Sequence, residues 1–447
     1  METAVIDEGR VGAKSSLVPM LIIGMLFFIF GFVTWLNGAL IPYLQTVCSL
    51  TSFEAMLVAS AFYIAYTVMA LPMAAIIERT GYKAGMALGL ALVGVGALIF
   101  IPAAYSRMFG VFLLAQFVVG SGLTILQTAS NPYVVKLGAP ETAAVRISIM
   151  GLLNKGAGIV APLVFAALVL SGITGISDTE LAVLSDAARD SKLAELAGQL
   201  VSPYVGMAIL GFALAVAMMF VPLPDIEDEV IEGQEEVAVT LPVLLKFPQL
   251  ILGSIALFFY VGVEVIAGDA IGLLGKQAGV GAATASKLTA YTMTFMVVGY
   301  VCGIAAIPRF ISQQVALFIS AVLGIVFTGL VMTGSLDSTA LSAASLSHVG
   351  LPEVPNAVFF VALLGFANAM CWPAIWPLAL DGLGKFTSKG AALLIMGISG
   401  GAILPPLYGH FADTGDGQAA YVIAIPAYLF IMFYALKGHK MRRWSKG

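Results

Sequence analysis

The chain has 447 residues, of which 60% are hydrophobic and only 10% are charged, and its formal net charge is −4. Soluble domains carry about 25% charged residues, so this composition excludes a soluble protein and predicts a polytopic membrane protein. Three cysteines and three scattered histidines predict neither a disulfide framework nor a metal site.

Twelve apolar segments follow a polar N-terminal stretch, METAVIDEGRVGAKSS, which lacks a cleavable signal pattern. Each segment is long enough to cross a bilayer whose hydrocarbon core is about 30 Å thick. In chain order the segments are 17–44, 53–77, 84–104, 108–136, 143–171, 203–222, 250–275, 285–307, 314–333, 355–380, 388–411 and 418–437. The predicted fold class is therefore an all-α polytopic membrane protein with twelve transmembrane helices.

Basic residues set the expected orientation of these helices. With both termini in the cytoplasm, 15 of the 21 Lys and Arg residues lie on the cytoplasmic side and five lie outside. This bias follows the positive-inside rule, in which acidic residues count little. The one basic residue left over is Lys155, which lies inside the fifth apolar segment.

The loop after the second segment, AAIIERTGYK at residues 74–83, resembles the loop motif Gly-x-x-x-Asp-Arg-x-Gly-Arg-Lys of the major facilitator superfamily. Its acid and two of its bases are Glu78, Arg79 and Lys83. An acid at a helix end beside cations can hold neighbouring helices in one conformation, so these residues are a candidate conformational latch. The alternative is a set of ordinary charged loop residues.

The two parts of the chain repeat one another. FFIFG at residues 27–31 matches FFYVG at residues 258–262. We therefore predict two pseudo-symmetric six-helix bundles, at residues 1–222 and 250–447, the second with a basic cytoplasmic tail. Residues 223–249 form an acidic cytoplasmic linker between them. This is the major facilitator fold, in which the substrate site lies near mid-membrane between the halves.

Several stretches carry a finer resemblance. They are LNGALIPYLQ at 36–45, SAFYIAYTVMALPMA at 60–74, LQTASNPYVVKLG at 126–138, LLNKGAG at 152–158 and FFYVGVEV at 258–265. In these the chain is similar to the fucose:proton symporter family, in its glucose/galactose/N-acetylglucosamine transporter branch. The resemblance implies a transporter, not an enzyme, that needs no cofactor. It would import a monosaccharide across the bacterial inner membrane by cation symport with alternating access.

Two positions depart from the pattern of the fucose transporter. Gly38 replaces an aspartate of the first helix, and Gln127 replaces a glutamate of the fourth helix. Gln127 can hydrogen-bond a hydroxyl group but cannot titrate. The asparagine of the fifth helix is retained as Asn154. The coupling ion, H⁺ or Na⁺, therefore stays open.

The candidate coupling and charge-pair residues are Lys155, Glu264 and Asp269, which lie inside predicted helices. A charge at bilayer depth costs about 2.5–3.5 kcal/mol on insertion scales, so each marks a structural pair or a functional site. Counted by helical rise from the ends of the segments, Glu264 lies at about the same membrane depth as Lys155. The repeat instead aligns Asp269 with Gly38, the position of the aspartate that is missing from the first helix. The sequence leaves open which acid pairs with Lys155. It also leaves open whether the lysine holds the halves together, takes part in coupling, or reaches the membrane interface.

Amides and tryptophans inside apolar helices supply the predicted sugar contacts, because amides bond hydroxyl groups and aromatic faces stack on sugar rings. The candidates are Asn37, Gln127, Asn131, Asn154, Asn368, Trp372 and Trp376, with Trp35 as a further one. Gln127 and Asn131 are four residues apart, so they share one helix face. The alternative for the tryptophans is bulky packing.

The expected partners are a monosaccharide such as glucose, galactose or N-acetylglucosamine, a coupling cation and the lipid bilayer. We expect no nucleic acid and a monomeric protein. Two other functions stay open. One is a facilitative or non-sugar transporter of the superfamily. The other is a non-transporting sugar sensor on the same scaffold, which the loss of two membrane carboxylates keeps in consideration.

Overall fold

The computed structural model describes residues 17–136, 143–169, 184–223, 241–307, 309–345, 352–383 and 386–444. Within these ranges, 12 segments are long and apolar enough to cross a membrane, which is the number that the sequence predicts. The described elements are all helical. A helix bonds its own backbone donors and acceptors internally, as a chain in hydrocarbon requires.

The first half of the chain contributes seven described helices. They are α1 (Leu17–Trp35), α2 (Asn37–Val47), α3 (Ser52–Ser106), α4 (Phe109–Lys136), α5 (Ala143–Val169), α7 (Asp186–Gly198) and α8 (Val201–Phe220). α3 packs against α4 and α8, and α1 packs against α5. Most of the predicted linker, residues 224–240, lies outside the described residues.

The second half begins with the short helix α9 (Leu241–Leu244) and ends near the C-terminus. Its other helices are α10 (Pro248–Asp269), α11 (Ile271–Gln277), α12 (Ala282–Ala285), α13 (Leu288–Ala306), α14 (Gln313–Thr333), α15 (Ala340–Ser345), α16 (Asn356–Asn368), α17 (Cys371–Leu380), α18 (Thr387–Met396), α19 (Gly400–Thr414) and α20 (Ala424–Leu436), with 3₁₀ turns η4 (Gly397–Ser399), η5 (Ala419–Ile423) and η6 (Gly438–Lys440).

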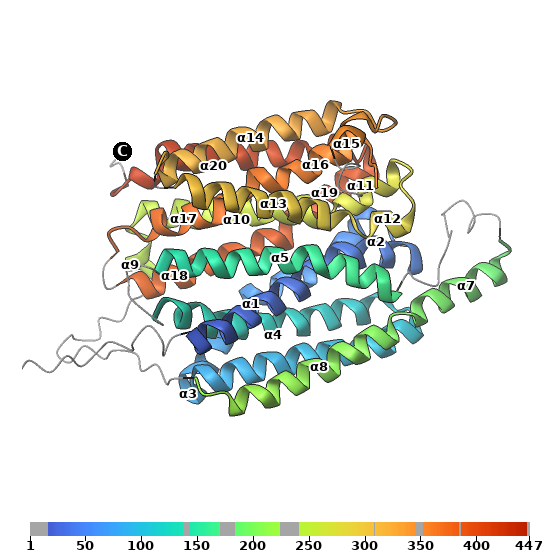
Figure 1. Cartoon of the computed structure of the whole chain (residues 1–447), viewed down its shortest axis with the longest axis horizontal. Coiled ribbons are helices and arrows are strands. Elements are labelled where there is room, and N and C mark those ends of the chain that lie inside the picture. The colour runs from blue at the N-terminus through green and yellow to red at the C-terminus, as the bar shows by residue number, and fades with distance from the viewer. Residues whose placement is uncertain are drawn as a thin grey trace, which may run out of the picture.

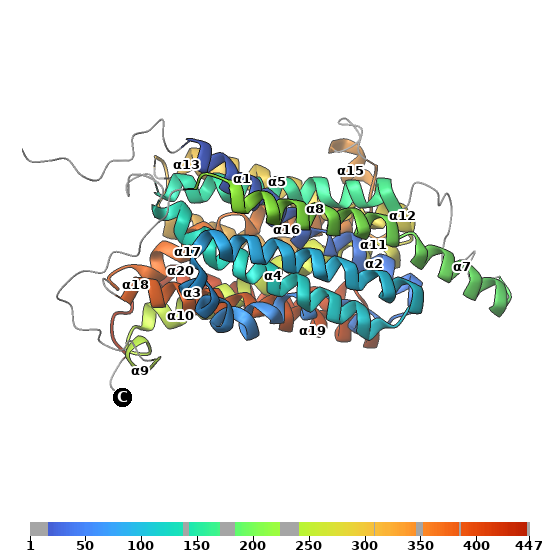
Figure 2. The ribbon, with the colours of Figure 1, turned by 90° about the horizontal axis from the view of Figure 1, so that it is seen from below.

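The long helices run side by side, with the first half below the second in Figure 1. Seen from below in Figure 2, α3, α4 and α8 of the first half lie nearest the viewer. The beginning of α1 and the C-terminus lie at the same end of the bundle, which we call the termini face; the other end is the opposite face. Between the halves, α5 packs against α13 and α3 packs against α19.

Two membrane segments differ from the expected ranges for physical reasons. The sixth spans Asp186–Phe220 instead of beginning near residue 203, because the polar helix α7 continues α8 beyond the bundle. Its sequence, DAARDSKLAELAG, lacks the apolar run that identifies a membrane segment. In α3, the second and third segments are separated only by a bend at Gly81, whose φ of 81° favours glycine.

Two membrane helices are interrupted at related places in the two halves. The first breaks at Leu36, between α1 and α2, and the seventh breaks at Ala270, between α10 and α11. Asp269 therefore directly precedes the break in the second half, as Trp35 does in the first. If the two halves are aligned at these helix breaks, Asp269 corresponds to Trp35. The short sequence match of FFIFG with FFYVG instead aligns Asp269 with Gly38, and the structure does not follow that alignment.

Asp413 joins the two halves at the opposite face. Its carboxylate, at the end of α19, accepts hydrogen bonds from the backbone N–H groups of Ser52 and Phe53, each at 2.7 Å. These groups belong to the first turn of α3, which Thr51 and Glu54 also cap in a reciprocal capping box. A carboxylate at a helix N-terminus bonds free donors and complements the helix dipole.

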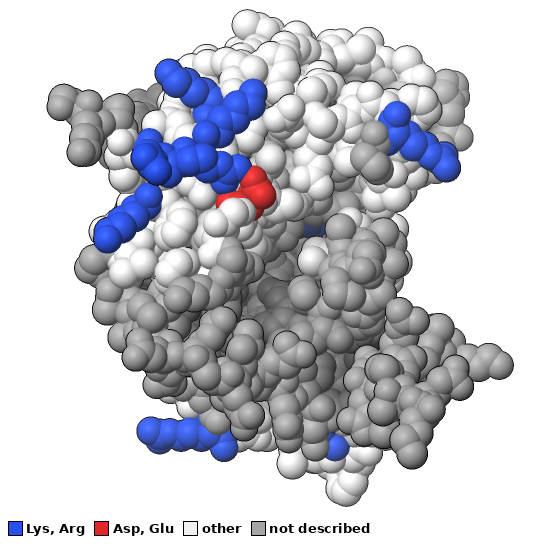
Figure 3. Space-filling model, turned by 90° about the vertical axis from the view of Figure 1, so that its left-hand side faces the viewer, with Lys and Arg blue, Asp and Glu red and all other residues white. Residues whose placement is uncertain are grey.

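A second contact between the halves lies at the same face. Lys276 of α11 donates from Nζ to Thr46 Oγ1 at 2.8 Å and to Gln45 Oε1 at 3.2 Å, both in α2. The opposite face is thus held closed by hydrogen bonds from two separate pairs of helices. The termini face, in contrast, is hollowed between the halves, and Lys and Arg side chains gather on its second-half side (Figure 3).

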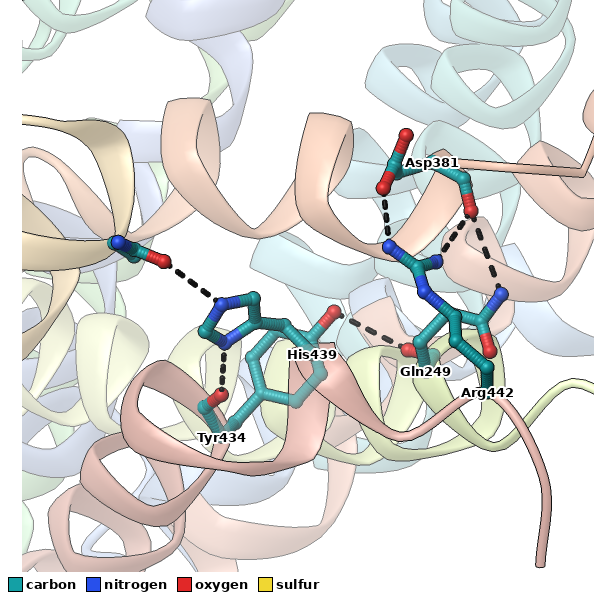
Figure 4. A network of polar contacts seen from close by, with 6 residues as sticks. Gln249, Asp381, Tyr434, His439 and Arg442 are labelled. Atoms are coloured by element: carbon teal, nitrogen blue, oxygen red, sulfur yellow. Dashed lines mark hydrogen bonds and ion pairs between the residues drawn. The ribbon is translucent and has the colours of Figure 1, made fainter.

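The C-terminal tail is bound to the termini face of the second half (Figure 4). The ring of His439 forms hydrogen bonds of 2.9 Å with the carbonyl oxygen of Tyr434 in α20 and with Gln314 Oε1 in α14. Arg442 forms an ion pair with Asp381 at the end of α17 and donates to its carbonyl oxygen at 2.8 Å. The tail thereby ties the ends of three helices together.

Candidate substrate and coupling site

A buried ion pair joins the two halves inside the bundle. Lys155 of α5 donates from Nζ to Glu264 Oε1 of α10 at 2.6 Å. The residues are 8% and 7% exposed, respectively, so both charges are largely removed from solvent. Of the two acids that the sequence leaves open as partners, the structure pairs Lys155 with Glu264.

The ring of Trp35, at the end of α1, lies against Lys155. The ammonium of Lys155 lies 4.5 Å from the centroid of the Trp35 ring, within the range of a cation–π interaction. The indole N–H donates to Asn154 Oδ1 at 3.4 Å, so the residue before the lysine is held by the same tryptophan. Gly268 lets the ring pack closely, because a Cβ there would lie 2.6 Å from the indole.

Aromatic side chains continue from Glu264 into the second half. The hydroxyl of Tyr260 donates to Glu264 Oε1 at 2.8 Å, one helical turn away on α10. The Tyr260 and Trp372 rings are 6.3 Å apart, and those of Trp372 and Trp376 are 5.4 Å apart. Both tryptophans of α17 stay partly exposed. We call this connected set the central cluster; it comprises Trp35, Asn154, Lys155, Tyr260, Glu264, Trp372 and Trp376.

A row of polar side chains from α3 and α4 extends toward Glu264 and Asp269. The partly exposed amide of Gln127 donates to the hydroxyl of Tyr66 at 2.8 Å. The Tyr66 ring stacks on Tyr63 at 6.3 Å between centroids. Tyr63 lies against Gly401 of α19 and near Asp269 and Glu264.

Two of the predicted sugar ligands are enclosed by their own half. Asn37 is 2% exposed and accepts a 2.8 Å hydrogen bond from Gln116. Asn368 is fully buried and accepts a 2.9 Å hydrogen bond from Tyr428. Each keeps its amide nitrogen without a hydrogen-bond partner among the described residues. Neither side chain faces open space in this conformation, in contrast to Gln127, Asn154, Trp372 and Trp376.

Gly38 has a packing role that the sequence did not indicate. A Cβ on Gly38 would lie 1.9 Å from the hydroxyl of Thr289 in α13, so α2 and α13 meet there across the interface of the halves. Thr289 in turn donates to the carbonyl oxygen of Gly268 at 2.7 Å. The aspartate that the fucose transporter pattern has at this position would collide with Thr289 in this conformation.

The remaining candidates are described only in part. The side chains of Glu78 and Asn131 lie outside what the structure describes. Arg79 and Lys83 are exposed and half-buried, and neither bonds another described residue. Three described interactions instead hold the opposite face: those of Asp413, Lys276 and Ser60, whose hydroxyl donates to the Ala402 carbonyl oxygen.

Sequence reasoning did not identify Tyr63, Tyr66, Tyr260 or Asp413. Tyr260 could have been found, because it precedes Glu264 by one helical turn and shares its face. Tyr63 and Tyr66 have the same kind of spacing, but no charge on their own helix distinguishes them. No group of three or more His, Cys, Asp or Glu residues suited to a metal ion occurs in the described part of the chain.

Comparison with known proteins relates this arrangement to other chains. The family model described as Major Facilitator Superfamily matches residues 23–403. The chain is 34% identical over 421 residues to a glucose/galactose transporter of Brucella abortus, with 93% of each chain covered. It is 28% identical to an L-fucose-proton symporter of Haemophilus influenzae, covering 98% of this chain and 99% of that one. A crystal structure of the transporter FucP in the outward conformation superposes with a TM-score of 0.68 and 24% identity, covering 94% of this chain and 98% of that one.

Two helical halves that are sealed at one face, hollowed at the other and joined by a buried ion pair define a membrane transporter of the alternating-access class. The chain belongs to the major facilitator superfamily, in the family that includes the fucose:proton symporters.

Proposed function

We propose that the protein imports a monosaccharide, such as glucose or galactose, by symport with a cation. The names of the glucose/galactose transporter and L-fucose-proton symporter relatives support a sugar as the substrate. The observation that carries the proposal is the central cluster, which brings partly exposed tryptophans and an amide around an ion pair shared by both halves.

The central cluster and Gln127, which lies outside it on α4, offer different contacts to a sugar. The amides of Gln127 and Asn154 can donate to and accept from hydroxyl groups, and the indole faces of Trp372 and Trp376 can cover the C–H surface of the ring. Asn37, Asn131 and Asn368 are proposed to act in other conformations of the cycle. Since the contacts come from both halves, a bound sugar favours the state in which the halves approach one another.

The ion pair gives a physical link between sugar binding and movement of the halves. Lys155 belongs to the first half and Glu264 to the second, so the pair has to be strained or broken when α5 and α10 separate. A buried charge that loses its partner is costly, by about 3–5 kcal/mol. Sugar hydroxyls between the two groups would replace the lost contacts and lower this cost.

We infer that the termini face lies in the cytoplasm and that the membrane is a bacterial inner membrane. The distribution of Lys and Arg supports this orientation, because 15 of 21 then lie inside. The hollow in Figure 3 would then open to the cytoplasm, which corresponds to an inward-facing state. We further propose a monomer with bundles at 1–222 and 250–447, and a Glu78, Arg79 and Lys83 latch that forms when the termini face closes.

The test is counterflow in liposomes that contain the purified protein and unlabelled sugar. External labelled D-glucose or D-galactose should accumulate transiently, and N-acetylglucosamine and L-fucose serve as comparison sugars. Gln127→Ala should reduce exchange, whereas Gln199→Ala, an amide outside the cluster, should not. Absence of exchange with all four sugars would contradict the proposal, and binding without exchange would indicate a sensor.

A further inference from the structure

Asp269 is an enclosed acid without a partner. It ends α10, is 0% exposed, and neither carboxylate oxygen has a hydrogen-bond partner among the described residues. Glu264, five residues earlier on the same helix, shows the opposite situation. One of its oxygens accepts from both Lys155 and Tyr260. Two carboxyl groups inside one membrane helix therefore have very different surroundings.

These surroundings decide which carboxyl group carries a proton. An ionised carboxylate in an apolar interior needs donors or a counter-charge, and without them it takes up a proton and becomes neutral. Asp269 has neither, so the neutral acid is its stable form in this conformation. Glu264 has a cation at 2.6 Å and a phenol donor, so a charged carboxylate there has the partners that it needs.

Among the described residues, no cation of a neighbouring element bonds Asp269, and Lys155 of α5 bonds Glu264 instead. Glu264 on its own helix and Tyr63 on α3 lie near it, and neither is positive. On α13, Thr289 and Thr292 donate instead to backbone carbonyl oxygens of α10, at 2.7 and 2.9 Å. Among the other elements packed there, α2 presents Asn37, whose oxygen accepts from Gln116, and α1 presents the Trp35 ring against Gly268. On α11, Lys276 donates to α2 at the opposite face.

The position of Asp269 makes its surroundings dependent on conformation. It directly precedes the break at Ala270, where α10 ends and α11 begins. α11 is held to α2 at the closed opposite face by Lys276. Opening of that face must separate α11 from α2 and would admit water to the end of α10, where the acid could exchange its proton.

We propose that Asp269 is the proton-binding group of the transporter, while Lys155 and Glu264 exchange no proton during the cycle. This deepens the proposed sugar symport and rests on it. Asp269 is ionised when water reaches it at the opened opposite face, and it binds one proton there. The halves then close over the neutral acid and the sugar. After the sugar leaves through the termini face, the proton leaves in a state that opens further on that side than the one described, so that water reaches the end of α10 and the carboxylate is restored.

The first experiment measures sugar and proton movements in the same liposomes. With a trapped pH dye, wild-type protein should carry protons inward when sugar is added outside, without sodium. Asp269→Asn mimics the neutral acid, so it should keep counterflow within about threefold and lose sugar-dependent proton movement. Glu264→Gln serves as the comparison and should impair both measurements, because Lys155 loses its partner.

The outcomes separate this inference from the proposed function. Retained proton movement in Asp269→Asn, or a wild-type protein driven by sodium alone, would overturn the role of Asp269 and leave sugar transport intact. If wild-type protein exchanges none of the sugars, the proposed function fails first.

A second measurement uses only wild-type protein, so it does not depend on whether a variant folds. A hydrophobic carbodiimide reacts with protonated carboxyl groups inside membranes, and mass spectrometry of wild-type peptides locates the adduct. The inference predicts an adduct on Asp269 and none on Glu264. An adduct on Glu264 alone, or on neither residue, would overturn it.

Discussion

Tyr260 and Glu264 lie one helical turn apart on α10, and the tyrosine hydroxyl donates to the same oxygen that accepts the ammonium of Lys155. A single oxygen therefore serves a donor from its own helix and a cation from the other half. Because a hydrogen bond to a charged group contributes about 1.5–3 kcal/mol, the phenol contributes substantially to the stability of the buried Lys155–Glu264 pair.

Tyr260→Phe should therefore lower the thermal stability of the purified protein and weaken sugar binding several-fold. The measurements are melting in detergent and binding by tryptophan fluorescence. Tyr291→Phe is a matched control, because the Tyr291 hydroxyl donates to a neutral carbonyl oxygen, that of Pro352, at 2.9 Å. Equal losses for the two variants would contradict a special role for the charged acceptor.

Replacing one partner of the ion pair should lower the stability of the protein more than replacing both partners. Lys155→Met and Glu264→Gln each leave one buried charge unpaired, at a cost of about 3–5 kcal/mol. The double variant has no buried charge in the pair and should regain most of the stability. It should not regain concentrative sugar uptake, which needs the link between the halves. Melting temperatures and uptake in liposomes test both statements, and concentrative uptake by the double variant would contradict the second.

Asp413→Ala should shift the protein toward a state that is open at the opposite face. The variant removes two bonds to the first turn of α3, and loss of a helix cap costs about 0.5–2 kcal/mol. Spin labels at Ser106→Cys and Asp337→Cys, on the two halves of that face in a cysteine-free background, should report a longer distance. Thr414→Ala, next to it on α19, is the control. An unchanged distance distribution in Asp413→Ala would show that Asp413 is not needed to close this face.

Trp372→Ala should weaken sugar binding by at least about tenfold, or about 1.4 kcal/mol. Its ring links Tyr260 to Trp376 and remains partly exposed, so its loss removes a stacking face from the cluster. Trp444→Ala changes a tryptophan outside the cluster and should leave affinity unchanged. Binding measured by displacement of labelled sugar distinguishes the two. A similar effect of both variants would favour the packing interpretation.

Truncation after Lys437 should lower the melting temperature without changing sugar affinity. The missing residues would take with them the hydrogen bonds of His439 to α14 and α20 and the ion pair of Arg442 with Asp381. The indole N–H of Trp444, which donates to the Leu245 carbonyl oxygen at 2.7 Å, would also be lost. A change in affinity equal to that of Trp372→Ala would mean that the tail acts on the site.

The sequence was sufficient for the twelve membrane segments because each is an apolar run with few charges, and hydrocarbon permits little besides helices for such runs. It also isolated Lys155 as the one basic residue that the expected orientation does not place at a membrane face. The same signal failed for α7, because its residues are polar although it forms one long helical segment with α8. Hydropathy reports where a chain enters hydrocarbon and not where a helix ends.

The partners of the candidate residues could not be predicted in the same way. Choosing Glu264 over Asp269 needed the helix rotation and the spacing of the two halves, neither of which is written in one helix. The latch was expected at the termini face from a motif, whereas the described contacts between halves at Asp413 and Lys276 lie at the other end. Those contacts depend on which conformation the halves adopt, and a sequence belongs equally to every conformation in the cycle.

Part of the interface between helices is main chain. A Cβ on Gly31 would lie 2.0 Å from the carbonyl oxygen of Asn154, and one on Gly38 would meet Thr289. Point mutations cannot change the chemistry of a backbone surface without adding atoms for which there is no space. New sugar preferences can therefore arise by replacing partly exposed side chains such as Gln127 and Trp372, whereas a larger residue at Gly31 or Gly38 would push apart the helices that meet there.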